Sequence, residues 1–164
     1  MTQKTLFARY LKDLPEGQLQ WIGLRPGHKQ EMRSVESVQA IARLGLEGDH
    51  RCYKTPDSGR QVTLISTEFI HIIGTYTGLG QIQPALLRRN LVVSGINLNA
   101  LRHQQFRIGG ALFEATALCH PCNRMNQTLG QGGAAAMLGY GGLCARILES
   151  GEIRLGDSLS PVIS

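Results

Sequence analysis

The stretch FRIGGALFEATALCHPCNRM, residues 106–125, indicates both the fold class of this chain and its chemistry. Its first part has the apolar pattern of β-strands, and Gly109 and Gly110 interrupt that pattern as glycines do at turns and bends. Directly behind it, Cys119 and Cys122 stand three positions apart, with a histidine and a proline between them. The stretch therefore poses two questions: how many such strands the chain contains, and what the two cysteines do.

Strand patterns of the same kind recur on both sides of this stretch, separated by glycine-rich turns. An alternating βαβ arrangement fits poorly because few helical patterns lie between the strands, whereas a barrel-like or sandwich core fits well. The sequence therefore predicts a mainly β fold with a few short helices. The predicted strands lie within residues 18–24, 35–41, 61–66, 90–95, 106–118, 143–151 and 153–162.

Two segments have helical spacing instead. Apolar residues on one helical face predict an amphipathic helix over residues 1–15, stopped by a Pro-Glu-Gly sequence. A second helix is predicted over residues 67–76, with Thr67 as its N-cap. Near the C-terminus, the sequence ESGEI predicts a tight hairpin turn around Gly151.

Length and composition restrict the class of protein. A chain of 164 residues suits one domain, and its 18% of charged residues and 42% of hydrophobic ones are typical of a folded globular protein. It contains neither a signal-peptide pattern nor an apolar run long enough to span a membrane, so we expect a cytoplasmic protein with reduced thiols. The net charge of +5 is dispersed and aromatic residues are few, so we expect no nucleic-acid partner.

A metal cage or a thioredoxin-like dithiol is the weaker interpretation of the cysteine pair. A structural zinc site needs four ligands, and the candidate second pair, His50 and Cys52, is only two positions apart. A thioredoxin-like motif is surrounded by a βαβ pattern, which this sequence lacks.

Two interpretations of Cys122 stay open on its sequence context alone. Pro121 suits the first turn of a helix and Arg124 brings a positive charge, and both features favour a reactive thiolate. The alternative is a buried structural thiol, because free cysteine is among the most buried residue types. Cys144 lies in an apolar strand pattern and is predicted to belong to the core.

A second motif, GLEGDHRC at residues 45–52, places a carboxylate beside an imidazole at the end of a strand. Neighbours such as Asp49 and His50 are able to orient a base or a metal ligand. The alternative is an ordinary polar loop, and this motif alone does not decide between the two.

The motifs, taken in order, resemble the MOSC domain, which is named after the C-terminal part of eukaryotic molybdenum-cofactor sulfurases. The resemblance covers about residues 18–162, so residues 1–164 are predicted to be a single MOSC domain of the small stand-alone bacterial type. The matching segments are residues 45–50, 60–68, 86–98, 106–125 and 141–159.

The resemblance implies a barrel-like β core and a role in binding the molybdenum cofactor or handling its sulfur. It implies that Cys122 is the thiolate ligand of the metal or the sulfur carrier, with Cys119 as a further catalytic candidate. Arg88 and Arg89 are expected to bind an anion such as the pterin phosphate, with one arginine facing a cleft and the other facing solvent. The residues expected to line the cofactor cleft are Gly48, Asp49, His50, Arg60, Arg88, Arg89, Asn90 and Arg124.

Three functions are compatible with these residues. The first is a molybdenum-cofactor-dependent reductase of N-hydroxylated compounds, served by a separate reductase partner. The second is a sulfur carrier that accepts persulfide sulfur from a pyridoxal-phosphate desulfurase. The third is a non-catalytic protein with structural thiols, so enzymatic activity itself stays open. We expect no bound cofactor when the protein is purified from a host that does not make it.

Overall fold

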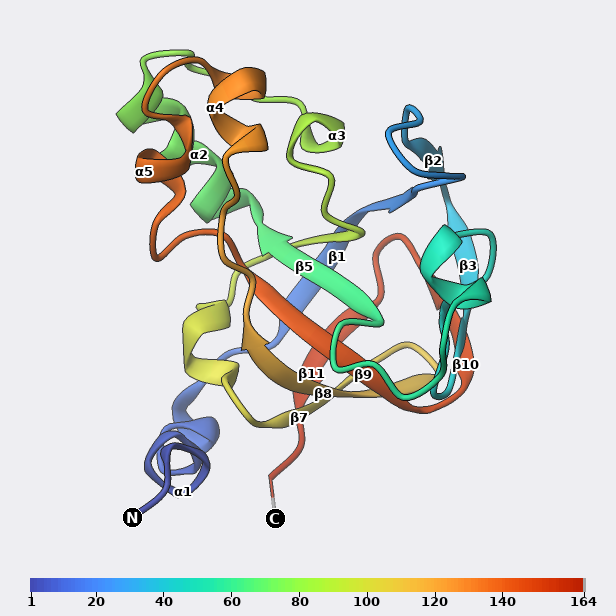
Figure 1. The fold of residues 1–164 in the computed structure, drawn as a ribbon. Coiled ribbons are helices and arrows are strands. Elements are labelled where there is room, and N and C mark those ends of the chain that lie inside the picture. Colours follow the sequence, from blue (N-terminus) through green and yellow to red (C-terminus); the bar gives the residue numbers. More distant parts are fainter. Residues whose placement is uncertain (164) are drawn as a thin grey trace.

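The computed structural model describes residues 1–163 and is built around a closed β-barrel (Figure 1). Eight strands form one sheet in the order β11-β7-β8-β9-β5-β6-β1-β2, and pairing of β11 with β1 closes all of them except β2 into a ring. Only the β5–β6 pair of this ring is parallel. The ring strands are β1 (Gly17–Leu24), β5 (Val62–Ser66), β6 (Leu91–Ser94), β7 (Gln105–Ile108), β8 (Ala111–Leu118), β9 (Leu143–Glu149) and β11 (Ser158–Pro161). The predicted mainly β, barrel-like fold is confirmed.

The remaining strands lie beside the barrel. β2 (Arg33–Val35) extends β1, while β10 (Gly151–Arg154), β3 (Ser37–Ile41) and β4 (Gly45–Leu46) form a small separate sheet. The predicted hairpin at Gly151 is therefore wrong, because β9 stays in the barrel and β10 pairs with β3. Gly151 is needed instead for close packing, since a Cβ there would collide with the carbonyl of Gly110.

The N-terminal helix is shorter than predicted. α1 (Gln3–Ala8) ends well before residue 15, and a separate 3₁₀ turn, η1 (Leu11–Asp13), follows it. No residue of α1 is buried, so no packing stabilises a longer helix, and short helices are marginal without packing. The buried Leu11 lies in the 3₁₀ turn instead.

The second predicted helix exists, but its N-cap lies one residue earlier than predicted. α2 (Thr67–Thr77) is capped by Ser66, whose hydroxyl accepts a hydrogen bond from the Phe69 N–H at 3.0 Å. Ser66 has the extended backbone of an N-cap because it ends β5, whereas Thr67 is already helical. The other short helices are α3 (Pro84–Leu87), α4 (Arg124–Leu129), α5 (Gly133–Met137), η2 (His50–Tyr53) and η3 (Leu98–Leu101).

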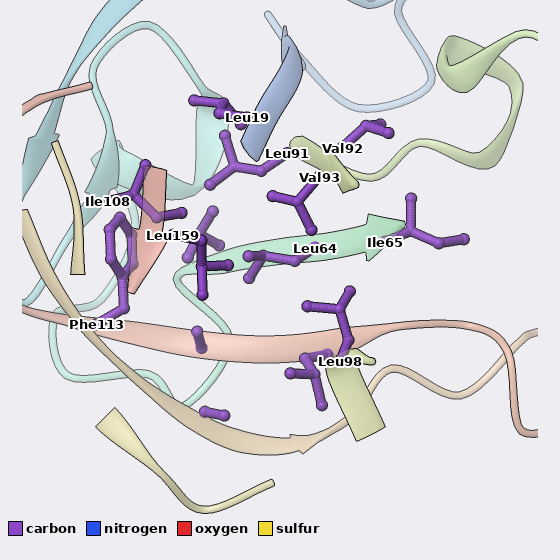
Figure 2. Packing of buried hydrophobic residues seen from close by; sticks show 14 of the residues in the cluster. Leu19, Leu64, Ile65, Leu91, Val92, Val93, Leu98, Ile108, Phe113 and Leu159 are labelled. Atoms are coloured by element: carbon purple, nitrogen blue, oxygen red, sulfur yellow. The ribbon is translucent and has the colours of Figure 1, made fainter. Parts of the chain in front are cut away.

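The core fills the barrel with aliphatic and aromatic side chains (Figure 2). Every residue of β5 is buried because β9 and β6 flank it and α2 packs nearby. The rings of Phe106 and Phe113 stack at 5.4 Å between their centroids. Figure 1 shows α2, α4 and α5 together at the end of the barrel that lies away from both termini, and β8 leads into this end.

Candidate functional site

Cys119 continues the barrel one residue past β8. Its N–H donates to the carbonyl of Gly142 at 2.8 Å, and the cysteine is only 2% exposed. On the neighbouring strand β9, Cys144 lies opposite Ala117, so Cys119 and Cys144 are diagonal neighbours across the strand pair. The Cys144 thiol lies beside the Cys119 sulfur, within reach of a hydrogen bond. Strand pairing thus brings together two cysteines that are far apart in sequence.

Two arginines surround this pair. Nη2 of Arg60, from the loop before β5, donates to the Cys119 sulfur at 3.4 Å. Arg89 is 6% exposed and donates from Nε to the carbonyl of Gly141 and from Nη1 to the carbonyl of Leu87, both at 2.9 Å. Its buried Nη2 has no hydrogen-bond partner among the described residues. We call Cys119, Cys144, Arg60 and Arg89 the thiol site.

The thiol site favours a thiolate on Cys119. The hydrogen bond from Cys144, together with the charges of Arg89 and Arg60, lowers the pKa of Cys119 and outweighs the opposing effect of burial. The same hydrogen bond, reinforced by burial, raises the pKa of Cys144. Burial would lower the pKa of Arg60, but the neighbouring thiols Cys119, Cys144 and Cys122 raise it. One cysteine therefore carries the charge and the other keeps the proton.

Two cavities adjoin the thiol site. Cys119 lines one of about 210 Å³ whose other walls are Leu118, His120, Pro121, Leu138, Gly139, Gly141 and Gly142. Cys144 and Arg60 line a second cavity, of about 380 Å³. Gly141 is required at the wall, because a Cβ there would collide with the Cys119 carbonyl and approach Arg89 Nη2 to 3.4 Å.

Cys122 lies outside the thiol site, on the exposed turn between β8 and α4. The expectation that Pro121 and Cys122 open a helix is wrong, because α4 begins at Arg124 with Asn123 as its N-cap. The turn is fixed instead by a hydrogen bond from the Met125 N–H to the Cys122 carbonyl at 2.9 Å. The proposed catalytic role of Cys122 itself stays a prediction.

Asp49 is fully buried, and its carboxylate is saturated with donors. Oδ1 accepts from the N–H and Nε of Arg25, at 2.8 and 3.1 Å, and from Nδ2 of Asn90 at 3.1 Å. Oδ2 accepts from Arg25 Nη2 and from the N–H of Arg51. Burial would raise the pKa of Asp49, but the hydrogen bonds and charge of Arg25 hold it below its usual value. This carboxylate anchors a loop and has no free lone pair for chemistry.

Asn90 joins three segments beneath Asp49. Its Nδ2 also donates to the carbonyl of Gly23 in β1, and its Oδ1 accepts from the N–H of Thr63 in β5. His50 is half-buried, and burial together with the charge of Arg25 lowers its pKa. The structure therefore gathers the predicted residues Asp49, His50 and Asn90 around Arg25, with Asp49 and Asn90 fully enclosed.

A group of positive charges lies beside Asp49. Arg88 ends α3 in the left-handed conformation and donates from Nη1 to the carbonyl of Gln30 at 2.7 Å. Burial lowers the pKa of Arg88, and the neighbouring charges of Arg25 and Arg124 lower it further. We call Arg25, Arg88 and Arg124 the arginine cluster. Arg89 is buried and Arg88 is half-buried, so the two adjacent arginines differ in exposure, and the expectation that one faces a cleft and the other faces solvent stays a prediction.

The predicted site residues thus fall into two groups joined by one turn. Cys119, Arg60 and Arg89 belong to the thiol site, and Arg88 and Arg124 belong to the arginine cluster. Cys122 precedes Arg124 of the arginine cluster by two residues and lies near enough to Arg60 of the thiol site to affect the pKa of Arg60. Gly48, with φ +90°, shapes the Asp49 loop near Arg33, since a Cβ there would lie 3.3 Å from Arg33 Nη2.

Sequence reasoning missed Arg25 and assigned Cys144 only to the core. Cys144 is buried as predicted, yet its thiol also belongs to the thiol site. No motif marks Arg25. Its role follows from a loop contact in which the His50 N–H donates to the Arg25 carbonyl at 2.8 Å and brings Asp49 against it.

Within the described part of the chain, no helix is both long and apolar enough to cross a membrane. The same residues contain no group of three or more His, Cys, Asp and Glu side chains arranged to hold a metal ion.

Comparisons with known proteins agree with the fold. A MOSC domain family model matches residues 47–160. The YuaD protein from Bacillus subtilis has a similar structure, with 17% identity, a TM-score of 0.75, and coverage of 89% of this chain and 95% of that one. YiiM from Escherichia coli is similar as well, with 19% identity, a TM-score of 0.68 and coverage of 88% and 69%. At these identities the structural likeness shows the fold alone. A search of curated proteins finds no match.

Proposed function

Since the chain belongs to the MOSC domain family, we propose that it binds the molybdenum cofactor, with Cys122 as the thiolate ligand of the metal. The observation that carries this proposal is the arginine cluster, whose members lie close enough to lower the pKa of Arg88. A phosphate placed among Arg25, Arg88 and Arg124 would relieve this repulsion, and guanidinium groups bind phosphate through paired hydrogen bonds.

The Asp49 carboxylate, beside the arginine cluster, does not take the place of this phosphate. Asp49 already accepts hydrogen bonds from Arg25, Arg51 and Asn90, and although its charge also raises the pKa of Arg88, burial and the charges of Arg25 and Arg124 outweigh it. An external anion is therefore the natural partner of these two arginines.

The available thiol also fits the cofactor. Molybdenum in this cofactor is held by soft sulfur donors, so one protein thiolate is a matching additional ligand. Cys122 is exposed and stands two residues before Arg124, so the same turn presents a sulfur and a positive charge. When bound, the cofactor supplies two-electron redox chemistry at the metal. In our proposal Cys122 binds the metal, while Arg88 and Arg124 orient the pterin phosphate.

The reaction that we propose is the reduction of N-hydroxylated compounds, with electrons from a separate reductase. Its support is the family resemblance and the fit of the thiol and the arginines to the cofactor. A second candidate is a sulfur carrier supplied by a pyridoxal-phosphate desulfurase. The exposure of Cys122 favours this candidate, because a donor protein must reach the accepting sulfur.

The test is expression in a host that makes the cofactor, followed by metal and pterin analysis of wild type and Cys122→Ser. We expect molybdenum and pterin in the wild type and a large loss in the variant. Arg107→Gln is a matched control, because Arg107 is an exposed arginine paired with Glu149 outside the cluster. Equal molybdenum in wild type and Cys122→Ser would exclude Cys122 as the ligand. A labile extra sulfur on Cys122 without molybdenum would favour the sulfur carrier.

A further inference from the structure

Arg89 is a buried cation that pairs with no carboxylate within residues 1–163. It is 6% exposed, and its two hydrogen bonds go to carbonyl oxygens, which carry no net charge. Its third group, Nη2, is buried and has no hydrogen-bond partner among the described residues. A guanidinium stays charged at any ordinary pH, and a buried charge is costly unless an anion compensates it. The surroundings of Arg89 should therefore contain an anion.

Cys119 supplies that anion. Arg89 Nη2 lies at the cavity wall next to Gly141 and the Cys119 carbonyl. The Cys119 sulfur accepts a hydrogen bond from Arg60 Nη2 at 3.4 Å, and the Cys144 thiol lies beside it. Each of these three groups favours the thiolate over the thiol. The Cys119 sulfur is therefore bonded to Arg60 and lies within the electrostatic influence of Arg89, and neither interaction involves Cys122.

The cavities admit small molecules to this thiolate but exclude proteins. Cys119 is only 2% exposed, so a large reagent has no access to its sulfur. The cavity that it lines has a volume of about 210 Å³, several times the roughly 30 Å³ share of a water molecule. A small, uncharged oxidant thus has room beside the sulfur.

We propose that Cys119 and Cys144 form a second reactive site, a dithiol that small hydroperoxides oxidise to a disulfide. The Cys119 thiolate attacks one peroxide oxygen, the O–O bond breaks, and the sulfur loses two electrons to give a sulfenic acid and hydroxide. The Cys144 thiol then displaces the sulfenic hydroxyl, and the S–S bond forms with release of water. The thiol proton of Cys144 leaves in this water, and the hydroxide from the first step takes up the proton that Cys119 released to solvent when it ionised. For hydrogen peroxide, the sum converts two thiols and one peroxide into one disulfide and two waters.

The strand pairing supports Cys144 as the resolving thiol. The two thiols are close enough to shift each other's pKa, and strand pairing places them diagonally across β8 and β9. Diagonal Cα atoms in a sheet are about 7–8 Å apart, whereas a disulfide needs roughly 4.4–6.8 Å. Closing the bond therefore requires a small shift, and Cys119 lies just beyond the last residue of β8, where the ladder ends.

The test uses the full chain carrying Cys122→Ser, treated with hydrogen peroxide and mapped by mass spectrometry. We expect the loss of two hydrogen atoms and a peptide pair that links Cys119 to Cys144. In the additional Cys144→Ala variant, we expect a sulfenic acid on Cys119 that dimedone traps. Circular dichroism confirms that the variants are folded, and the Cys122→Ser result stands even if Cys144→Ala does not fold.

Reagent size provides an independent test on the wild type. A bulky maleimide should label Cys122 and spare Cys119, whereas hydrogen peroxide should oxidise Cys119 in the same preparation. Oxidation of Cys52 before Cys119, or reduced thiols at both Cys119 and Cys144 after treatment, would overturn the proposal. These readouts need no cofactor, so their failure is distinct from a failure of the molybdenum proposal.

Discussion

Asp49 and Arg89 are both buried charges near the same end of the barrel, yet the protein satisfies them differently. Asp49 accepts hydrogen bonds from the side chain and backbone of Arg25, from Arg51 and from Asn90. Arg89 meets two neutral carbonyls and keeps one N–H group unpaired among the described residues. A buried charge with all its hydrogen bonds made stabilises the fold. A buried charge with a hydrogen bond unmade shifts the pKa of a nearby ionisable group instead. Here that group is Cys119.

The largest effect is expected from Asp49→Asn. The variant removes the partner of Arg25 and turns an amide towards groups that are themselves donors. Breaking a buried ion pair costs about 3 kcal/mol or more, and we expect a loss of that size in the free energy of unfolding, measured in urea. Asp57→Asn is the matched control, because Asp57 pairs with Arg43 on the exposed surface. Equal stability of the two variants would contradict the structural role of Asp49.

The pH dependence of stability tests whether the charge of Asp49 is what stabilises the fold. The pKa of Asp49 is held below its usual value in the folded protein. Its stabilising contribution is therefore complete above the unfolded value of about 3.9, and it is lost as the pH falls through the lower folded value. The stability difference between wild type and Asp49→Asn should be constant near neutral pH and should narrow in acid. A difference that stays constant down to acid unfolding would show that the Asp49 charge is not the source of the effect.

Arg89→Met should affect the thiol site more than the Asp49 loop. Loss of the charge should raise the pKa of Cys119 and slow its reaction with hydrogen peroxide most in mildly acidic solution, where the thiolate fraction depends on that pKa. The carbonyls of Gly141 and Leu87 also lose their donor, which should cost about 1–3 kcal/mol of stability. Arg89→Lys separates the two effects, because it keeps the charge but not the fork of donors. If Arg89→Met reacts with hydrogen peroxide at the wild-type rate, groups other than Arg89 stabilise the Cys119 thiolate.

The smallest effect is expected from Arg88→Lys, which keeps the charge and tolerates the same left-handed backbone. If Arg88 binds the pterin phosphate, cofactor retention should fall a few-fold, because an ammonium group lacks the bidentate geometry. The difference should grow as salt is raised, since salt screens the remaining charge. Arg107→Lys, outside the cluster, should retain the wild-type content. Wild-type retention by Arg88→Lys across a salt series would place the anion site elsewhere.

The local features of the fold were predictable from the sequence. Apolar runs and glycine turns marked β1, β5, β6 and β9 to within a residue or two at most ends, because these signals depend on neighbouring residues alone. The order of the motifs also predicted the family, which the match over residues 47–160 supports. Short-range signals failed where alternatives were close in energy, as at Ser66 and Thr67, where the strand end decided which residue caps α2.

Only the tertiary structure decided which strands and side chains far apart in sequence contact each other. β10 follows β9 almost directly, yet it pairs with β3, so the hairpin that the turn sequence predicted does not form. Cys119 meets Cys144 because β8 pairs with β9, and it meets Arg60 from a loop 59 residues away. Arg25 reaches Asp49 in the same way, through a loop contact that no motif records. Sequence alone determined which residue types are available for chemistry, and strand pairing determined which of them touch, because contact between distant residues depends on the packing of the whole barrel.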